Sequence, residues 1–228
     1  MMKDLAQLID HTALKATTTE DDIRKLCNEA IEYSFKTVCV PTCYVGMANQ
    51  LLADTGVGIT TVVGFPLGNE TPAAKAFEAK EAILNGATDV DMVINVGALK
   101  DEKYDYVKFD IEEVVKACKQ TNPNTIVKVI VETCYLTSEE IEKVTEIVVE
   151  AGADFIKTST GFGTGGATIE DVSLMSKVAA GRIKVKASGG IGDAQTAEAM
   201  VEAGAERLGV SRSIAIVTGA KTQENGDY

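Results

Sequence analysis

Charged side chains interrupt segments of this sequence that otherwise have the composition of buried β-strands. Parallel strands covered on both faces are nearly continuous hydrophobic runs, so a charge within one requires an explanation. The charges are Asp91 in Val90–Asn95, Lys128 in Thr125–Glu132, Lys157 in Phe155–Thr158 and Lys186 in Ile183–Ala187. A single lysine of this kind is usually a salt-bridged structural residue. Three lysines and an aspartate in comparable strands instead indicate a reaction site.

Two of these lysines suggest a covalent mechanism. A lysine attacks a carbonyl carbon only as a free amine, and its ordinary pKa of about 10.4 leaves almost none of it neutral at pH 7. Burial and a second ammonium group nearby both lower that pKa. If Lys157 and Lys186 lie on adjacent strands, we expect Lys186 to activate Lys157 for formation of an imine (Schiff base). The imine withdraws electrons from the neighbouring carbon, so a carbon–carbon bond can break or form without a metal or a cofactor.

Lys128 and Asp91 are expected to complete this site. Alternation along the strand puts Lys128 on the face opposite Val127 and Val129. The valines suit the side that faces helices, so Lys128 should point inward, where a charge is costly unless a carboxylate such as Asp91 pairs with it. Asp91 is also the candidate proton donor and acceptor for the reaction.

The strands that carry these residues must be neighbours in one sheet. Short β-branched segments alternate with longer segments of helical periodicity, which predicts successive βαβ units and a parallel sheet. The expected strands are Asp10–Leu14, Thr37–Val40, Ile59–Val63, Val90–Asn95, Thr125–Glu132, Phe155–Thr158, Ile183–Ala187 and Leu208–Val210. The expected helices are Thr19–Tyr33, Tyr44–Ala53, Pro72–Asn85, Tyr104–Gln120, Ser138–Glu150, Ile169–Ala180 and Asp193–Ala203.

Eight parallel strands predict a single-domain (β/α)8 barrel, the TIM barrel, with its active site at the carboxyl ends of the strands. We expect residues 1–220 to form the barrel and 221–228 to be a polar, mobile tail. A doubly wound open sheet is the alternative, but no glycine-rich dinucleotide motif follows the first strand. Lys184 begins its strand, so it should lie at the other end of the barrel from Lys186.

Three loops near the end of the chain are candidates for binding a phosphate group. They follow the strands of Lys157 and Lys186 and the last strand, and glycines there let backbone N–H groups approach an anion closely. In barrels the loops after the seventh and eighth strands commonly bind phosphate. The candidate residues are Gly161, Gly189, Gly190, Gly209, Ser211 and Arg212.

Composition excludes several other functions. The net charge of −12 argues against binding to nucleic acid or an anionic membrane. The chain has a single histidine, His11, which argues against a Ser-His-Asp triad and against metal sites built from several histidines. The five cysteines are scattered, so they suggest neither a disulfide framework nor a zinc site. No apolar run reaches the roughly 18–20 residues that span a bilayer, and the first residues do not resemble a signal peptide, so we expect a cytoplasmic protein.

The motifs together resemble the deoxyribose-phosphate aldolase family, over nearly the whole chain. The resemblance is carried, in family order, by Ile9–Thr12, Thr37–Pro41, Val63–Gly68, Asp89–Asn95, Lys128–Thr133, Phe155–Gly161 and Lys186–Ile191. It implies reversible cleavage of 2-deoxy-D-ribose 5-phosphate to D-glyceraldehyde 3-phosphate and acetaldehyde, with the imine on Lys157. It also implies that Lys186 lowers the pKa of this amine, that Asp91 transfers protons and that Lys128 supports them.

The same resemblance implies further site residues and an assembly. Asp10, Thr12, Cys39 and Thr158 would line the substrate pocket, and a terminal tyrosine, here Tyr228, would assist proton transfer. Family barrels of this kind pair, so a homodimer or homotetramer is expected, with phosphorylated sugars and aldehydes as small-molecule partners.

The phosphate region departs from the family pattern. The family commonly has arginine after Gly189–Ile191, where this chain has Gly192, and two successive serines after the last strand, where this chain has Ser211 followed by Arg212. We hypothesise that Arg212 restores the missing positive charge from the neighbouring loop.

Three other functions remain open at the level of sequence. The chain could be another Schiff-base aldolase that acts on a ketose phosphate, or a metal-free phosphosugar isomerase that uses its carboxylates. It could also be a non-catalytic phosphate-binding barrel, in which the lysines would be fully charged and salt-bridged.

Overall fold

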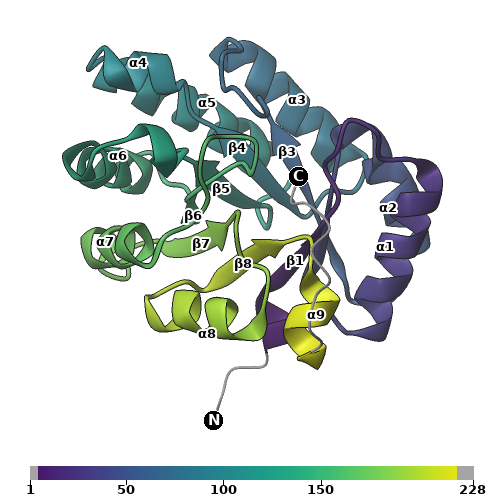
Figure 1. Cartoon of the computed structure of the whole chain (residues 1–228). Helices are drawn as coiled ribbons and strands as arrows, with labels where there is room; N and C mark the ends of the chain where they lie inside the picture. The colour runs from purple at the N-terminus through teal and green to yellow at the C-terminus, as the bar shows by residue number, and fades with distance from the viewer. Residues whose placement is uncertain (1–4, 220–228) are drawn as a thin grey trace.

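The computed structural model of the chain describes residues 5–219, and these form a closed barrel of eight parallel strands surrounded by helices (Figure 1). The strands are β1 (Ile9–Thr12), β2 (Thr37–Val40), β3 (Gly58–Val63), β4 (Asp89–Val93), β5 (Ile126–Ile130), β6 (Phe155–Lys157), β7 (Lys184–Ser188) and β8 (Arg207–Val210). The helices are α1 (Glu20–Glu32), α2 (Val45–Leu51), α3 (Pro72–Leu84), α4 (Val96–Lys100), α5 (Tyr104–Thr121), α6 (Ser138–Glu150), α7 (Ile169–Ala179), α8 (Ala194–Glu202) and α9 (Ser213–Thr218). Three 3-10 turns, η1 (Leu5–Leu8), η2 (Thr42–Tyr44) and η3 (Thr133–Tyr135), complete the described elements.

The predicted (β/α)8 barrel is confirmed, and the doubly wound alternative is wrong. The deciding contact is between the first and last strands: β1 pairs in parallel with β2 and also with β8. An open sheet would leave two of its strands with a free edge, whereas each of the eight strands here has two neighbours. Closure removes every edge, and it brings the carboxyl ends of all eight strands to one mouth.

Local sequence signals start the helices where they were expected. Thr19 and Thr137 both accept a hydrogen bond from the backbone N–H three residues later, and the acidic side chain at that third position bonds back to the cap. These capping boxes satisfy backbone N–H groups that the first helical turn leaves unpaired. Thr71 caps α3, whose first residue, Pro72, needs no hydrogen bond from its nitrogen.

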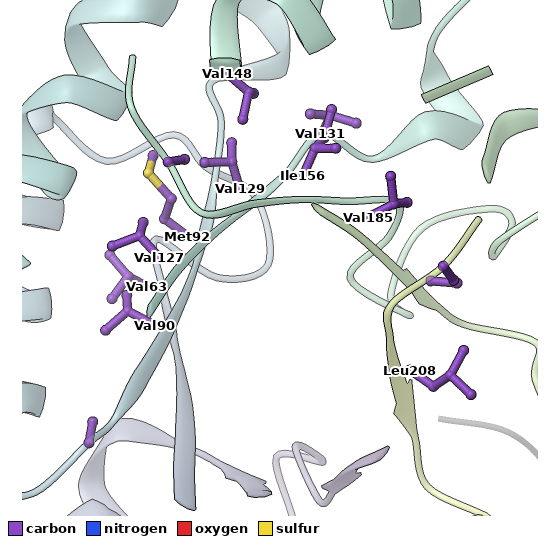
Figure 2. Close-up of a cluster of buried hydrophobic side chains, with 14 of the residues drawn as sticks. Val63, Val90, Met92, Val127, Val129, Val131, Val148, Ile156, Val185 and Leu208 are labelled. Carbon is purple, nitrogen blue, oxygen red and sulfur yellow. The ribbon is translucent and has the colours of Figure 1, made fainter. Parts of the chain in front are cut away.

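The hydrophobic core lies between the strands and the helices. Val90, Met92, Val127 and Val129 are fully buried, and Figure 2 shows them on the side of β4 and β5 that faces away from the barrel axis. Alternation along the strands therefore turns Asp91 and Lys128 inward, as predicted. The apolar layer holds the helices, while the interior of the barrel is left to polar groups.

Several predicted strands end earlier in the structure than in the sequence analysis. The segment Val90–Asn95 was expected to be a strand throughout, but β4 ends at Val93 because the Asn95 side chain caps the unpredicted helix α4, accepting from the N–H of Ala98 at 2.9 Å. β5 ends at Ile130, and Glu132 has the left-handed φ of 56°. After both strands the backbone turns as it leaves the barrel, at the edge where an active site is built.

Candidate active site

The strand register brings the predicted charged residues to one level of the barrel interior. Lys157 on β6 is directly opposite Lys186 on β7. Asp91 on β4 is opposite Lys128 on β5 in the same way. Residues in register on neighbouring parallel strands point to the same face, so all four side chains enter the barrel. The expectation that Lys157 and Lys186 lie on adjacent strands is confirmed.

Asp91 is the centre of this group. Its Oδ2 atom lies 2.8 Å from Nζ of Lys157 and 2.7 Å from Nζ of Lys186, and its Oδ1 atom lies 2.9 Å from Nζ of Lys128. Asp91, Lys128 and Lys186 have no exposed surface, and Lys157 is 3% exposed. One buried carboxylate thus holds three lysines at hydrogen-bonding distance, and Lys157 is the one with access to the mouth of the barrel.

A second group of charges, deeper in the barrel, supports the first. Asp10 pairs with Lys186 and, at 2.7 Å, with Arg207. Asp89 lies 2.8 Å from Lys128 and 3.3 Å from Arg207. Neither Asp89 nor Arg207 was predicted to be a site residue. The same two-residue alternation could have found them, because Asp89 precedes Asp91 by two positions and Arg207 precedes Gly209 by two.

Asp10 therefore belongs to the interior network in this structure, rather than to the pocket rim alone. Its Oδ1 atom also accepts a hydrogen bond from Thr37 at 2.8 Å, and Thr37 in turn contacts Thr60 at 2.9 Å. The predicted assignment of Asp10 to substrate binding is not tested by these contacts. They show that this carboxylate is already fully engaged by protein groups.

Electrostatics keep the two central carboxyls ionised. Burial alone would raise the pKa of Asp91, but Lys128, Lys157 and Lys186 outweigh it and hold that pKa well below its ordinary value. Burial would likewise raise the pKa of Asp10, and here the positive charges of Lys186, Lys128 and Arg207 lower it. Asp91 is thus an anion in the resting site.

Lys128 is held in its charged form by the same network. Burial would lower the pKa of Lys128, but the carboxylates of Asp89, Asp91 and Asp10 raise it above its ordinary value. An ammonium group this well paired is a poor nucleophile. Its place in the network agrees with the supporting role that we predicted.

Lys184 shows what a lysine of the same strand looks like outside the site. It begins β7, its side chain is exposed, and Nζ lies 5.7 Å from the ring centre of Phe155. Within residues 5–219 it makes no ion pair of the kind that Lys186 makes. Its predicted place at the opposite end of the barrel is confirmed.

An apolar patch adjoins the ion-paired network near the mouth. Cys39 is buried and clusters with Leu14, Val62 and Phe65. Burial raises the pKa of the Cys39 thiol to about 11, so it is a neutral, weakly polar group at pH 7. The predicted pocket role of Cys39 stays a prediction.

The two predicted threonines have intramolecular hydrogen bonds. Thr12 donates to its own strand, at the carbonyl of Asp10, over 2.8 Å. The Thr158 hydroxyl donates to the carbonyl of Ser188 at 3.2 Å and accepts from the N–H of Ser188 at 3.1 Å. Thr158 thus ties β6 to β7 just beyond Lys157, and its substrate contact stays a prediction.

Glu132 is a buried carboxylate that the sequence analysis did not assign to the site. It accepts hydrogen bonds from the backbone N–H of Thr160, at 3.1 Å, and from the Thr160 hydroxyl. The Thr160 hydroxyl oxygen also accepts from the N–H of Phe162 at 3.0 Å. Glu132 therefore fixes the start of the loop that follows Lys157, and it lines a cavity of about 170 Å³ with Tyr135, Phe162 and five further residues.

The predicted phosphate loops lie against each other. A Cβ atom on Gly189 would lie 3.8 Å from Cα of Gly161, and one on Gly166 would lie 2.4 Å from the carbonyl carbon of Gly189. The N–H of Ala167 bonds to the carbonyls of Ser188 and Gly189 at 3.0 and 3.1 Å. Only glycine permits this approach at position 166, so the loops after β6 and β7 form one surface.

The third loop contributes Arg212. A Cβ atom on Gly192 would lie 3.4 Å from Nη1 of Arg212, so the guanidinium group lies directly beside Gly192. Gly209 has a different role in the described structure. A Cβ atom there would lie 3.0 Å from Cε of Lys186, so the absent side chain leaves room for that lysine.

Some expectations lie outside what this geometry addresses. Tyr228 and the segment 221–228 are outside the described residues. Within residues 5–219 no group of three or more His, Cys, Asp or Glu side chains is arranged to hold a metal ion. None of the described helices is long and apolar enough to cross a membrane.

Comparison with known proteins gives one consistent result. The model of the DeoC/LacD family of aldolases matches residues 5–220. A deoxyribose-phosphate aldolase of Carboxydothermus hydrogenoformans is 57% identical over 221 residues, which is 97% of each chain. One of Halalkalibacterium halodurans is 55% identical over the full length of both chains. The solved tetrameric deoxyribose phosphate aldolase of Aeropyrum pernix is 32% identical, with a TM-score of 0.88 over 94% of this chain and 90% of that one.

Proposed function

Because the chain belongs to the DeoC/LacD family of aldolases, we propose that it reversibly cleaves 2-deoxy-D-ribose 5-phosphate to D-glyceraldehyde 3-phosphate and acetaldehyde through an imine on Lys157. The observation that carries this proposal is the contact of Lys157 and Lys186 with one oxygen of Asp91. The curated relatives that match along nearly the whole chain bear the name of this activity. We assign the enzyme to the cytoplasm, where it would serve the degradation of deoxyribose and deoxyribonucleotides.

Charge balance supports Lys157 as the nucleophile. The ion-paired cluster within residues 5–219 holds four cationic side chains, those of Lys128, Lys157, Lys186 and Arg207, and three carboxylates, those of Asp10, Asp89 and Asp91. With all of them charged the cluster has an excess of one positive charge, which the loss of one proton removes. Among the described contacts, Lys157 pairs with one carboxylate while Lys186 pairs with two, so Lys157 is held by fewer ion pairs than Lys186.

The reaction then needs one proton to be removed from the sugar and another to be added to the enamine. The Lys157 amine attacks the aldehyde carbon of the open-chain sugar, and the resulting carbinolamine loses water to give an iminium ion. A base next removes the proton of the C3 hydroxyl, the C2–C3 bond breaks, and its electron pair forms an enamine as glyceraldehyde 3-phosphate leaves. Protonation of the enamine carbon and hydrolysis release acetaldehyde and restore the amine.

Asp91 and Lys186 are placed to transfer these protons. Asp91 is an anion in the resting site, so it enters the reaction as the base. The ammonium group of Lys186 lies 2.7 Å from the same oxygen and can return a proton through it, directly or through water. Lys128 keeps the opposite oxygen of Asp91 fixed. Tyr228 is proposed to assist the step at the enamine carbon.

The phosphate group is proposed to bind where the last three loops meet. Gly161, Gly189 and Gly190 offer backbone N–H groups, and Ser211 and Arg212 add a hydroxyl and a positive charge. The position of the Arg212 guanidinium beside Gly192 supports the hypothesis that it replaces the arginine usual in the neighbouring loop. The aldehyde end of the substrate would then lie towards Cys39 and Thr12.

The assembly is proposed to be a homodimer or homotetramer. The solved relative from Aeropyrum pernix is described as tetrameric, and its structure aligns with 94% of this chain. Size-exclusion chromatography with light scattering measures the mass directly. A monomer at micromolar concentration would overturn this part of the proposal.

One experiment tests the chemistry. The protein is incubated with acetaldehyde and sodium borohydride, digested and analysed by mass spectrometry. We expect the mass of an ethyl group on Lys157, together with loss of cleavage activity. A ketose phosphate that protects Lys157 while deoxyribose 5-phosphate is not cleaved would favour the other Schiff-base aldolase, and the absence of any adduct would favour the isomerase or the non-catalytic barrel.

A further inference from the structure

His11, the one histidine of the chain, lies where the barrel closes. It is on β1 between two inward-facing residues, so its side chain points outward, and the ring packs against Phe35 with 5.0 Å between ring centres. It is 3% exposed. On β8 its register partner is Val210. His11 thus lies at the contact between the first and last strands, on the side opposite to the lysines.

Both ring nitrogens of His11 have partners on other elements. Nδ1 lies 2.8 Å from Oγ of Ser213, the first residue of α9, and Nε2 lies 2.8 Å from Oε2 of Glu29 on α1. The Ser213 hydroxyl is fully buried and also lies 3.2 Å from the carbonyl oxygen of Val210. One imidazole therefore connects helices that are 184 residues apart in the chain, since 213 minus 29 is 184.

The hydrogen bonds of this group are satisfied with the ring neutral or charged. A neutral ring donates from Nε2 to Glu29 and accepts at Nδ1 from the Ser213 hydroxyl. A charged ring donates from both nitrogens, and the Ser213 hydroxyl then donates to the carbonyl of Val210. Each state leaves every buried donor with an acceptor, so the ring holds Ser213 in place in both.

Ser213 ends the loop that carries two of the proposed phosphate contacts. β8 ends at Val210, and Ser211 and Arg212 lie between that strand and Ser213. The strand fixes one end of this short loop, and the bond from His11 to Ser213 fixes the other. The guanidinium group beside Gly192 is therefore positioned from outside the barrel, through the backbone of its neighbour.

We propose that His11 is a positioning residue for substrate phosphate: through Ser213 it fixes Ser211 and Arg212, and Glu29 fixes the ring. This inference rests on the proposed function, because it concerns the same phosphate site. It assigns His11 and Ser213 to binding of the phosphorylated substrate and leaves the imine chemistry on Lys157 unaffected.

Two substitutions of His11 separate this role from simple core packing. The amide of asparagine reaches the position of Nδ1 and can bond to Ser213, whereas the amide of glutamine reaches the position of Nε2 and can bond to Glu29. The matched hydroxyl variants are Ser213→Ala and, as a control, Thr218→Ala. Thr218 is on the same helix, is exposed, and bonds only to the carbonyl of Ile214 in the described structure.

Steady-state kinetics are compared for deoxyribose 5-phosphate and for unphosphorylated 2-deoxyribose. Loss of one buried hydrogen bond corresponds to about a fivefold to tenfold change, so His11→Gln and Ser213→Ala should raise KM for the phosphorylated sugar by about that factor, with kcat within about twofold. Both should leave kcat/KM for the unphosphorylated sugar within about twofold. Thr218→Ala should remain within about twofold of the parent protein on both substrates, and His11→Asn, which can keep the bond to Ser213, should raise KM for the phosphorylated sugar less than His11→Gln does.

The inference would be overturned by an unchanged KM for the phosphorylated sugar in Ser213→Ala. It would also be overturned if His11→Asn and His11→Gln lowered kcat/KM equally on both substrates. Calorimetric titration with inorganic phosphate supplies a readout that is independent of turnover. Weaker phosphate binding in Ser213→Ala than in Thr218→Ala supports the inference even if the parent protein fails to cleave the sugar, which would overturn only the proposed function. Equal phosphate affinities would overturn the inference alone.

Discussion

Lys157 and Lys186 are register partners on β6 and β7, and their ammonium groups contact the same Oδ2 atom of Asp91. The two lysines therefore differ in their remaining surroundings rather than in their distance from the carboxylate. Lys186 is also paired with Asp10 on β1, whereas Lys157 is the residue with access to the mouth. This asymmetry supports the proposal that Lys157 forms the bond to substrate and that Lys186 contributes to the charge balance.

Replacement of Lys157 by methionine should abolish the borohydride-trapped adduct and lower kcat by more than about a thousandfold, because the other two lysines bonded to Asp91 have no exposed surface. The adduct is measured by mass spectrometry of the digested protein. Lys184→Met is the matched control, since Lys184 is a lysine of β7 at the other end of the barrel. An adduct that persists in the Lys157 variant would show that another amine reacts.

Replacement of Asp91 by asparagine should lower kcat by about 10² to 10⁴. The amide cannot accept the proton, and it leaves the four cations of the cluster with two carboxylates. Exchange of the acetaldehyde methyl protons with deuterium, followed by NMR, isolates the proton-transfer step from substrate cleavage. A variant that cleaves slowly but exchanges at the parental rate would contradict the role of Asp91 as the base.

Acid should destabilise the protein through Asp10 and Asp91. Their folded-state pKa values lie below the ordinary 3.8, so between those values and about 3.8 the unfolded chain binds protons that the folded chain does not. The stabilisation is complete above pH 3.8 and is lost as the pH falls through the folded-state values. The free energy of unfolding, measured with urea between pH 3 and 6, should therefore fall less steeply with decreasing pH in Asp10→Asn than in the parent. Asp54→Asn, at an exposed position, should retain the parental slope.

Replacement of Arg212 by alanine should raise KM for deoxyribose 5-phosphate by about tenfold or more and leave the unphosphorylated sugar unaffected, since a charged hydrogen bond to phosphate contributes about 1.5–3 kcal/mol. Arg182→Ala is the control, because Arg182 is an exposed arginine paired with Glu146. If kcat/KM falls equally for both sugars, Arg212 has a structural role instead.

The buried pair of Lys75 and Asp110 tests stability outside the site. The two groups are 2.6 Å apart with no exposed surface, and Lys75 also donates to the carbonyl of Val93 at the end of β4. Lys75→Met leaves a buried carboxylate without its cation and should lower the free energy of unfolding by about 3–5 kcal/mol. Chemical denaturation measures this directly. A loss below about 1 kcal/mol would mean that water or another donor replaces the amine.

The alternation of the strands allowed much of this site to be predicted. Parity alone turned Lys128 inward, because the valines beside it needed the helix layer. The same reasoning would have reached Asp89 and Arg207 had their strands been extended by one residue at the start. The end of β4 is set by a local contact, the Asn95 cap of the short helix α4, which the strand-like composition of Val90–Asn95 conceals.

His11 illustrates a different limit. As the only histidine of the chain it served to exclude triads and metal sites, and the sequence suggested no further role for it. Its partners Glu29 and Ser213 are 18 and 202 positions away. Only closure of the barrel brings Ser213 to it, and this contact has no local signature. Glu132 lies beyond the end of β5 at a left-handed residue, so alternation along the strand does not predict the direction of its side chain.

Gly209 has a consequence for redesign of this barrel. Because the wall of β8 has no side chain at that position, the stem of Lys186 fills the gap. Libraries intended to widen the range of accepted aldehydes should therefore leave residue 209 constant. They should instead vary Leu14 and Phe65, which pack with Cys39 in the apolar cluster.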